Sequence, residues 1–547
     1  MNSLLTLSSA ISWICFVVPG LYLASAALTL RSWPHPLRVW TLASRLSGLA
    51  VIGAALLAFG SAFAPPVADP LGAFFGLTFA EDRVLSVRTD LLSGVMLLLV
   101  SFVGWVVMRF SRRYLDGDPE QMRYLARLSL TLAAVCLLVC SNNLLMIAVS
   151  WFGTSLALHG LLTHFRERLP AQIAAHKKFL LSRLADVCLL GAVALIASSF
   201  GTLELDKIFE RVQHVGALPT NVAWACGFIA VSALLKCAQL PFHGWLIQVM
   251  EAPTPVSALL HAGVVNIGGF VLLRLAPLMT HAEAAQGLLL LVGAVTASVA
   301  SLVMLTRISI KVMLAWSTCA QMGLMLVECA LGAYEMALLH LVAHSLYKAH
   351  AFLSAGGAVA SYRVAAMSPR TQGSAFGVQL LLGGACSALL AGGLSLVGVH
   401  LVNQPAHWFP LAMLALALPS LLLKLPQQQS LKSLAFLALA GLGVALAFAL
   451  SHLAFGQLVP TGVQMMPVST PAAAFATANL ALLFVIHAWV RRRPESRFSL
   501  WLYPRAFAGF YLDELFTRLT FRLWPAKLPA SLSIQLALPQ PQESLSS

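Results

Sequence analysis

Residues 234–246 read Leu-Leu-Lys-Cys-Ala-Gln-Leu-Pro-Phe-His-Gly-Trp-Leu, and residues 251–255 follow as Glu-Ala-Pro-Thr-Pro. The first stretch closes a long apolar run and places one lysine, Lys236, well inside it. The prolines beyond it cannot continue a regular helix, because proline lacks an amide hydrogen and clashes with the preceding turn. Pro253 and Pro255 therefore predict a helix that is broken close to a buried charge.

The composition of the whole chain is suited to a membrane. Of its 547 residues, 59% are hydrophobic and only 10% are charged, whereas soluble domains carry roughly a quarter charged residues. So few charges cannot cover this much apolar surface in water. A soluble enzyme, a secreted disulfide scaffold and a disordered chain are excluded. The net charge of +14 fits lysines and arginines in cytoplasmic loops. The sequence lacks a basic run interleaved with aromatic residues, the pattern that would indicate nucleic-acid binding.

Stretches long enough to cross a bilayer with little or no charge recur from end to end. They predict an all-α polytopic membrane protein with about 15 transmembrane helices. The expected spans are 4–28, 46–64, 89–109, 124–140, 143–164, 178–199, 222–250, 255–276, 284–306, 311–332, 335–361, 375–399, 408–424, 433–455 and 471–490.

The charges of the connecting loops predict an orientation. If each span crosses once, the loops on one side include 31–45, 109–127 and the tail from Arg491, all of them basic. The short loop 251–255 falls on the same side and is not basic, so it departs from the pattern. By the positive-inside rule this side is cytoplasmic, which places the N-terminus outside and the C-terminus inside.

Ionisable residues inside the spans are the candidates for function, because each costs on the order of 3 kcal/mol at mid-bilayer. Lys236 beside a broken helix resembles a transporter site, and the alternative is a lysine that reaches out to the interface. His340, His344 and Lys348 recur every four residues and share one helix face. Such a stripe suits proton transfer. Metal binding by its two histidines lacks a visible third ligand.

Four other polar residues within the spans are candidates for function. His261 is either a proton carrier or a hydrogen-bonded core residue, since its span is otherwise apolar. Arg183 and Asp186 are three residues apart and can pair on a helix. They form either a structural ion pair or a group that tunes and gates the path. Glu328 has no partner nearby in the sequence.

The stretch 234–246 and its continuation through 252–262 resemble the signature of the proton-conducting antiporter-like subunits. These are the large membrane subunits of respiratory complex I and of Mrp antiporters. Residues 310–318 and 510–515 match the same family over shorter lengths. The resemblance implies two inverted repeats of five helices, each with a broken helix, joined by a polar axis across the membrane.

Applied to this chain, the resemblance makes Lys236 the central lysine. The linking polar groups are then His261, His340, His344 and Lys348. The expected division is N-terminal helices at 1–110, a first repeat at 111–280 with its break near 240–255, a second, degenerate repeat at 281–430, C-terminal helices at 431–490 and a cytoplasmic amphipathic tail at 491–547.

Two departures from the family pattern indicate which of its subunits the chain resembles most. Trp151 is followed by Phe152, where the family usually carries a glutamate, and residues 383–404 lack the charges usual in the second repeat. With the form of residues 257–266, these departures make the chain most similar to the membrane subunits of bacterial DAB inorganic-carbon accumulation complexes. The peripheral partner in those complexes, DabA, has a carbonic-anhydrase-like zinc site.

The expected function is therefore conduction of a cation, preferably H+ with Na+ open, through the bacterial inner membrane. A DabA-like zinc protein on the cytoplasmic face would act on CO2, so we expect no cofactor in this chain and no enzymatic activity of its own. One alternative is a subunit of complex I or of an Mrp-type antiporter. Another is a scaffold that only anchors its partner, which the missing glutamate favours.

Overall fold

The computed structural model describes residues 2–30, 35–62, 67–68, 85–214, 217–357 and 469–525, with isolated positions between 405 and 455. The spans expected at 375–399, and most of those at 408–424 and 433–455, lie outside the described residues. The elements, in chain order, are α1 (Asn2–Leu28), α2 (Pro36–Gly60), β1 (Val67–Ala68), β2 (Val87–Arg88), α4 (Leu91–Tyr114), α5 (Gln121–Cys140), α6 (Leu144–Leu162), α7 (Leu169–Phe200), α8 (Leu205–Gln213), α9 (Thr220–Lys236), α10 (Gly244–Gln248), η1 (Val249–Glu251), α11 (Thr254–Ala262), η2 (Val264–Asn266), α12 (Ile267–Arg274), α13 (Ala276–Met279), α14 (Glu283–Met304), α15 (Ile310–Ala330), α16 (Tyr334–Leu353), η3 (Ala355–Gly357), α21 (Thr470–Arg492), α22 (Arg497–Phe507), η5 (Gly509–Tyr511) and α23 (Glu514–Leu523).

The described part of the chain is a helical membrane protein, as the sequence predicts. Ten of its helical segments are long and apolar enough to cross a bilayer. Each predicted span within the described ranges corresponds to a helix or to a pair of short helices. A two-residue antiparallel ladder, β1 with β2, and two isolated antiparallel bridges, Val87 with Ser141 and Asn143 with Glu204, are the departures from all-α structure in these ranges. The total of about 15 spans and the inverted repeats stay predictions.

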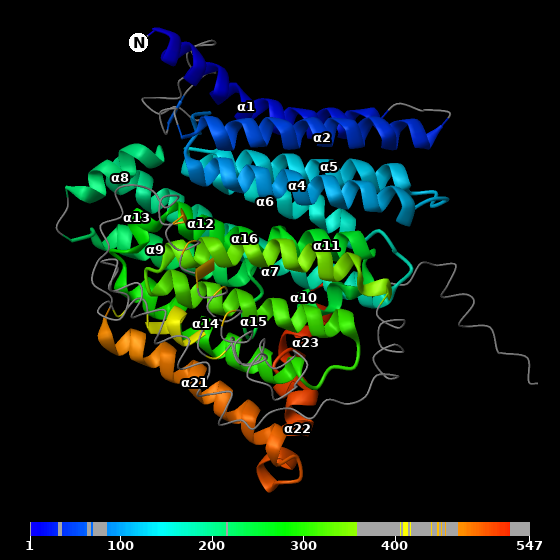
Figure 1. The fold of residues 1–547 in the computed structure, drawn as a ribbon, viewed down its shortest axis with the longest axis vertical. Coiled ribbons are helices and arrows are strands. Elements are labelled where there is room, and N and C mark those ends of the chain that lie inside the picture. Colours follow the sequence, from blue (N-terminus) through cyan, green and yellow to red (C-terminus); the bar gives the residue numbers. More distant parts are fainter. Residues whose placement is uncertain are drawn as a thin grey trace, which may run out of the picture.

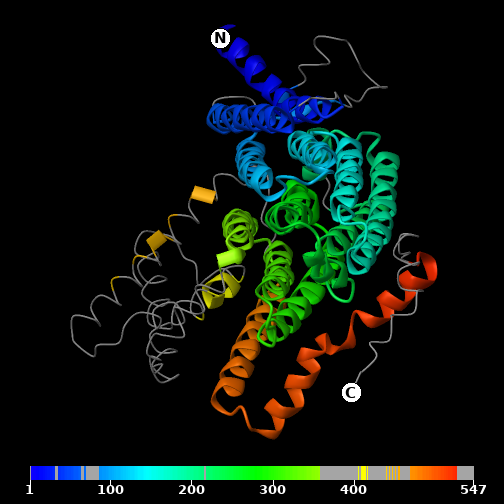
Figure 2. The same ribbon diagram turned by 90° about the vertical axis from the view of Figure 1, so that its right-hand side faces the viewer.

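The long helices run side by side, with α1 and α2 at one edge of the bundle and α21 at the opposite edge (Figure 1). Viewed along the helices, α21, α22 and α23 lie apart from the α1–α2 pair, with the remaining helices between them (Figure 2). In the apolar stretch of the span formed by α11 and α12, 89% of the residues are buried, whereas in that of α21 only 17% are. The broken segment that carries the polar groups is therefore at the centre of the protein.

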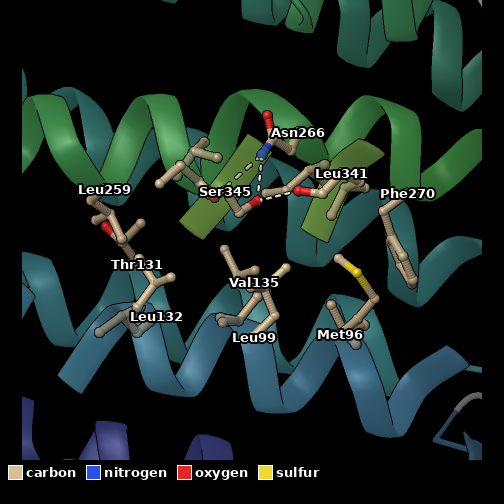
Figure 3. Close-up of a pocket in the computed structure, with 17 residues that line it drawn as sticks. Met96, Leu99, Thr131, Leu132, Val135, Leu259, Asn266, Phe270, Leu341 and Ser345 are labelled. Carbon is tan, nitrogen blue, oxygen red and sulfur yellow. Dashed lines mark hydrogen bonds between the residues drawn. The ribbon is translucent and has the colours of Figure 1, made fainter. Parts of the chain in front are cut away.

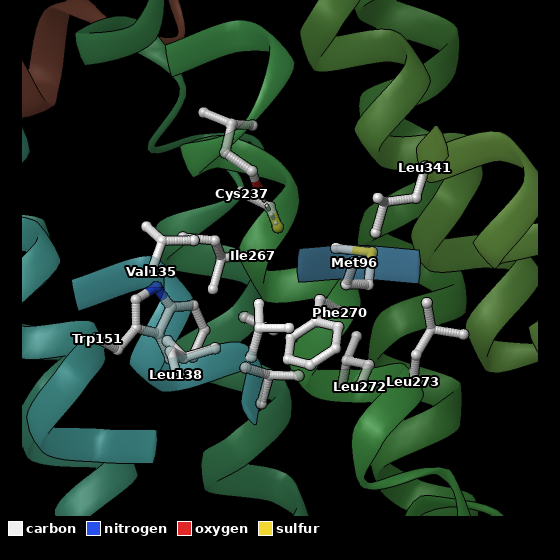
Figure 4. Close-up of a cluster of buried hydrophobic side chains, with 14 of the residues drawn as sticks. Met96, Val135, Leu138, Trp151, Cys237, Ile267, Phe270, Leu272, Leu273 and Leu341 are labelled. Carbon is white, nitrogen blue, oxygen red and sulfur yellow. Dashed lines mark hydrogen bonds between the residues drawn. The ribbon is translucent and has the colours of Figure 1, made fainter. Parts of the chain in front are cut away.

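Apolar packing holds α12 in this central position. Figure 4 shows Phe270 and Ile267 among side chains of α4, α5 and α6, including Met96, Val135 and Trp151. Phe270 is fully buried. Removing such a side chain from water contributes roughly 1.5–3 kcal/mol, although lipid rather than water surrounds much of this bundle.

Local signals in the sequence set the ends of several helices. The Asp90 carboxylate accepts a hydrogen bond from the Ser93 amide at the start of α4. The Asn143 side chain does the same for the first turn of α6. Both residues are preferred N-caps, because their side chains satisfy amides that have no partner within the helix. Gly201 ends α7 with φ 61°, a left-handed conformation that glycine adopts without strain.

The expected continuous spans 222–250 and 255–276 are both interrupted in the structure. The helix α9 stops at Lys236, and only short helical turns follow until α11 begins at Thr254. A second interruption at Gly263 separates α11 from α12. Proline explains the first break, because Pro241 cannot donate the hydrogen bond that would continue α9. Backbone groups freed by such a break must find other partners, and the Leu240 amide bonds to the Thr296 hydroxyl at 3.1 Å.

Candidate ion-translocation site

Lys236 ends α9 inside the bundle and pairs with a carboxylate on α7. Its Nζ lies 2.6 Å from Oδ1 of Asp186. The other oxygen, Oδ2, lies 2.7 Å from Nη2 of Arg183, one turn away on the same helix. Lys236 and Asp186 are both buried. One carboxylate is therefore shared by two cations, so the gating pair predicted from its spacing directly contacts the predicted central lysine.

Aromatic rings hold the two cations where the family usually supplies a glutamate. The Lys236 ammonium lies 4.1 Å from the centre of the Trp151 ring, and the Arg183 guanidinium lies 4.1 Å from that of Phe152. Cation–π contacts of this kind stabilise a charge by about 0.5–2 kcal/mol without adding a negative group. Asp186 is therefore the carboxylate that balances Lys236 in this structure.

A second buried lysine adds to the positive charge around Asp186. Lys178 donates from Nζ to the carbonyl and hydroxyl oxygens of Ser155, at 2.9 and 2.8 Å. It lies close enough to Lys236 and Arg183 for their charges to repel. Lys236 and Arg183 contact the Asp186 carboxylate directly, and Lys178 is held nearby by Ser155.

The histidine stripe on α16 has a carboxylate partner on α15. His340 Nδ1 lies 3.0 Å from Oε2 of Glu328. Its ring centre is 6.1 Å from that of His344, the next member of the stripe. Glu328 is buried, so the residue without a partner in its sequence neighbourhood finds one across the helix pair.

The other end of the stripe meets the broken span. Lys348 is fully buried and donates to the Leu314 carbonyl at 3.1 Å. It has no carboxylate within ion-pair distance among the residues the structure describes. His261 of α11 stacks on Phe352 with ring centres 4.5 Å apart.

Several polar atoms around the break have no hydrogen-bond partner within the described ranges. They are both ring nitrogens of His261, Nε2 of His340, Nε2 of His344 and Oδ1 of Asn266. Buried polar atoms in proteins are nearly always paired with protein or water. These atoms therefore give the centre of the bundle several polar groups that no described side chain or backbone group satisfies.

An apolar pocket lies beside this group, between α4 and α5 on one side and α11, α12 and α16 on the other (Figure 3). Met96, Leu99 and Val135 point toward it from the α4–α5 side. Across it, the Asn266 amide donates to the Ser345 hydroxyl at 2.8 Å. That bond joins the second interruption of the broken span to the helix of the stripe.

The two polar groups are separate in this structure. No hydrogen bond or ion pair within the described ranges joins the Lys236–Asp186 pair to the His261–Lys348 group. The prolines predicted to break the helix mark the start of α11, where Pro253 precedes the first turn and Pro255 lies within it. Lys311 of α15 donates to the Thr254 hydroxyl at 2.8 Å, so the break is fixed to a neighbouring helix.

A polar cluster closes the bundle at the end where α8 and α13 lie. The fully buried Arg274 contacts Asp90 at 2.6 Å, and Arg88 contacts the same carboxylate at 3.1 Å. Arg88 also donates to Asn142, whose amide donates to Asp206 at 2.8 Å. Burial alone would raise the pKa of Asp90, but the guanidinium groups of Arg274 and Arg88 hold it well below its usual range.

At the opposite end, the C-terminal tail docks on the broken segment. Lys177 of α7 is completely buried, and its Nζ lies 2.7 Å from Oδ2 of Asp513. Trp524 stacks on His176 with ring centres 4.0 Å apart and planes 9° apart. A side chain at Gly244, the first residue of α10, would collide with the Asp513 carboxylate. The sequence predicts an amphipathic tail at 491–547, and part of it packs on this chain itself.

Sequence reasoning missed the partners that come from distant parts of the chain. Asp513 was seen only as part of a family match, and Arg274 was not singled out. A lone arginine in the apolar run from Ile267 was an available signal, because buried arginine requires a partner.

The comparisons with known proteins agree with these features. A family profile described as NADH:quinone oxidoreductase/Mrp antiporter, TM, matches residues 141–401, and one described as NADH-ubiquinone oxidoreductase (complex I), chain 5 N-terminus, matches residues 82–125. The probable inorganic carbon transporter subunit DabB of Hydrogenovibrio crunogenus is 42% identical over 445 residues, which cover 80% of this chain and 83% of that protein. The chain belongs to the DabB family of inorganic carbon transporter subunits. DabB2 of Halothiobacillus neapolitanus is 36% identical and aligns over 94% of both chains.

More distant relatives include respiratory subunits. NADH-quinone oxidoreductase subunit L of Mycobacterium tuberculosis is 36% identical over 276 residues, 50% of this chain and 43% of that protein. Among solved structures, the Mrp complex from Dietzia sp. DQ12-45-1b matches with a TM-score of 0.63 at 23% identity, covering 96% of this chain and 60% of that chain. This last likeness establishes the antiporter-like fold, as the sequence motif implied.

Proposed function

We propose that this protein is the cation-conducting membrane subunit of a two-component transporter that accumulates inorganic carbon, CO2 or bicarbonate, in the bacterial cell. Its preferred ion is the proton. The partner is a DabA-like peripheral zinc protein on the cytoplasmic face, which performs the chemistry on carbon. The DabB relatives support the substrate class, and the group of buried Lys236 and Asp186 with half-buried Arg183 carries the proposal of conduction.

The shared carboxylate supplies a way for a proton to move. Asp186 balances Lys236 and Arg183 at once, so loss of the Lys236 proton leaves Asp186 paired with Arg183 alone and never unpaired. A buried charge without a partner is costly, on the order of 3–5 kcal/mol when one member of a pair is removed. Arginine keeps its proton at any relevant pH. Lys236 is therefore the member that releases and regains one.

The stripe on α16 continues the path in this proposal. Glu328, His340 and His344 form a chain of titratable groups, with orphaned ring nitrogens suited to water between them. Histidine can accept a proton on one nitrogen and release one from the other. Lys348 and His261 lie at the meeting point of this chain with the broken span.

The docked tail connects the path to the partner. A cavity of about 490 Å³ lies between the tail and the broken segment, lined by His243, Arg307, Trp316 and Asp513 among others. Asp513 contacts Lys177 on one side and lies against α10 on the other. A partner that shifts α23 would move this carboxylate and change access to the break. Because this coupling works in both directions, ion movement at the break would shift α23. An ion gradient would then drive a conformational change in the partner.

An accumulation assay tests the proposed function. Cells that lack other carbonic anhydrases would express this chain with its partner, and each subunit alone would serve as control. We expect accumulation only with the pair, and collapse by a protonophore while ATP is held constant. Collapse by a sodium ionophore instead would replace the proton by Na+. Accumulation that resists both ionophores would contradict coupling to an ion gradient.

A further inference from the structure

A groove of about 560 Å³ opens on the outer side of α5 and α6, beside α1. Most of its lining is small or aliphatic and includes Ala134, Gly153, Ala157, Leu130 and Leu156. The two leucines are 42% and 44% exposed. In a membrane-spanning bundle, exposed leucines on this scale face the acyl chains. The groove is therefore open to lipid and not to water.

One end of the groove is cationic. Arg127 lines it together with His159 and Gly160, and Nη1 of Arg127 donates to the Gly160 carbonyl at 2.6 Å. An added Cβ at Gly160 would lie 2.6 Å from Arg127 Nε. The glycine thus lets the guanidinium lie flat across the backbone of α6.

No ion pair neutralises the charge of Arg127 in the described ranges. The charged groups that act on it are the guanidinium groups of Arg166 and Arg123 and, with a smaller effect, the Glu120 carboxylate. Arg123 itself is paired with Glu120. A half-buried guanidinium beside an apolar channel is suited to an anion with an apolar body.

We propose that this groove binds one anionic phospholipid, with its phosphate on Arg127 and an acyl chain along Gly153 and Ala157. A planar guanidinium holds phosphate through two parallel hydrogen bonds, and basic pockets between transmembrane helices recognise anionic headgroups. A transmembrane helix of a partner would fill the small-residue channel but would bring no negative charge to Arg127. The apolar walls exclude a soluble polyanion.

The headgroup position adjoins the docked tail. His159, at the cationic end, lies 6.1 Å from the Trp524 ring, measured between ring centres. Tryptophan is enriched at the level of lipid headgroups. The bound lipid would therefore lie where the end of α23 meets the body of the protein, and it would fill the space between α5, α6 and the membrane.

Lipid retention by the full chain, purified with its partner, tests this site. The complex would be incorporated into vesicles of equal parts phosphatidylglycerol and phosphatidylethanolamine, re-extracted, and its bound lipids weighed by native mass spectrometry. Arg127→Gln removes the charge but keeps a donor for the Gly160 carbonyl. Gly153→Leu fills the channel, and an added Cβ there meets only Ala134, at 3.8 Å.

Two matched controls make the same changes elsewhere. Arg109→Gln removes an exposed arginine that lies over Trp105. Gly287→Leu adds the same bulk to α14, where an added Cβ meets nothing within 4 Å.

We expect the wild-type chain and both controls to retain phosphatidylglycerol in preference to phosphatidylethanolamine. Arg127→Gln should lower that preference about fivefold, the effect of one basic residue at an anionic surface, and Gly153→Leu should lower retention of both lipids. Equal retention in all five proteins, or no preference for phosphatidylglycerol in the wild type, would overturn the proposal. Loss of a co-purified membrane protein from Gly153→Leu, with lipid unchanged, would also overturn it and assign the groove to a helix.

Discussion

At the scale of single residues, the proposed conduction depends on one carboxylate that contacts two cations. Asp186 touches Lys236 and Arg183 at nearly equal distances, 2.6 and 2.7 Å. Two aromatic faces keep the cations in place in the absence of a second carboxylate. In the proposed mechanism, loss of the Lys236 proton leaves Asp186 with Arg183 as its partner.

Replacement of the shared carboxylate is the first prediction. Asp186→Asn leaves Lys236 buried without a negative partner, so carbon accumulation should fall by at least tenfold while membrane insertion persists, a loss of ~1.4 kcal/mol or more. Accumulation and membrane content would be measured together. Asp116→Asn, a change at an exposed position, is the control. Undiminished accumulation by Asp186→Asn would remove this carboxylate from the path.

The pair of Glu328 and His340 gives a second prediction. If the two act as one unit, Glu328→Gln and His340→Ala should each lower accumulation, and the double variant should be little worse than either single variant. The same non-additive pattern is expected when His344→Ala and Lys348→Ala are combined with His340→Ala. Effects that simply add would indicate packing and not a relay.

At the scale of elements, the broken helix and the C-terminal tail contact each other at Asp513. The start of α10 lies against Asp513, and the same carboxylate neutralises Lys177 of α7. The residues Gly509, Phe510 and Tyr511 just before it have φ values of 63°, 53° and 59°. For Phe510 and Tyr511 a left-handed conformation costs about 1–2 kcal/mol each, so the turn that presents Asp513 is held by its surroundings.

Displacement of the tail is the third prediction. Gly244→Val places a side chain where the Asp513 carboxylate lies, so α23 should detach and the partner should bind less tightly. Cleavage near Arg493 by a protease and co-purification of the partner would be measured. Gly227→Val, where an added Cβ meets nothing within 4 Å, is the control. A tail as protected as in the wild type would contradict this docking.

The arginine cluster at the other end of the bundle gives a prediction about pH. Arg274 and Arg88 depress the pKa of Asp90, so the cluster contributes stability above the ordinary aspartate pKa of about 4 and loses it as pH falls below that value. The melting temperature of the wild type should exceed that of Asp90→Asn at pH 7, and the difference should shrink on acidification toward pH 3. A constant difference across this range would contradict the ion pairing.

At the scale of the whole molecule, local and distant interactions differ in how well the sequence predicts them. Spans follow from apolar runs, the break follows from its prolines, and the pairing of Arg183 with Asp186 follows from helical spacing. The contact of Lys236 with Asp186 joins residues 50 positions apart, and that of Lys177 with Asp513 joins residues 336 apart. Such contacts depend on how helices rotate and slide in packing, which periodicity does not specify.

The family resemblance located polar groups but not their partners. It placed Lys236 and the stripe on α16, and it pointed to a missing glutamate at Phe152. It did not show that Phe152 would lie beneath Arg183 or that Glu328 would meet His340. Phe152 and Asp186 therefore contact the same guanidinium, that of Arg183.

The most direct test compares carbon accumulation by Lys236→Ala and Lys236→Arg, each co-expressed with the partner in cells that lack other carbonic anhydrases. Conduction through Lys236 predicts that both variants insert, co-purify with the partner and fail to accumulate inorganic carbon, because alanine carries no proton and arginine does not release one. Normal accumulation by both variants, with the partner bound, would contradict conduction at this site and leave the protein as an anchor for its partner.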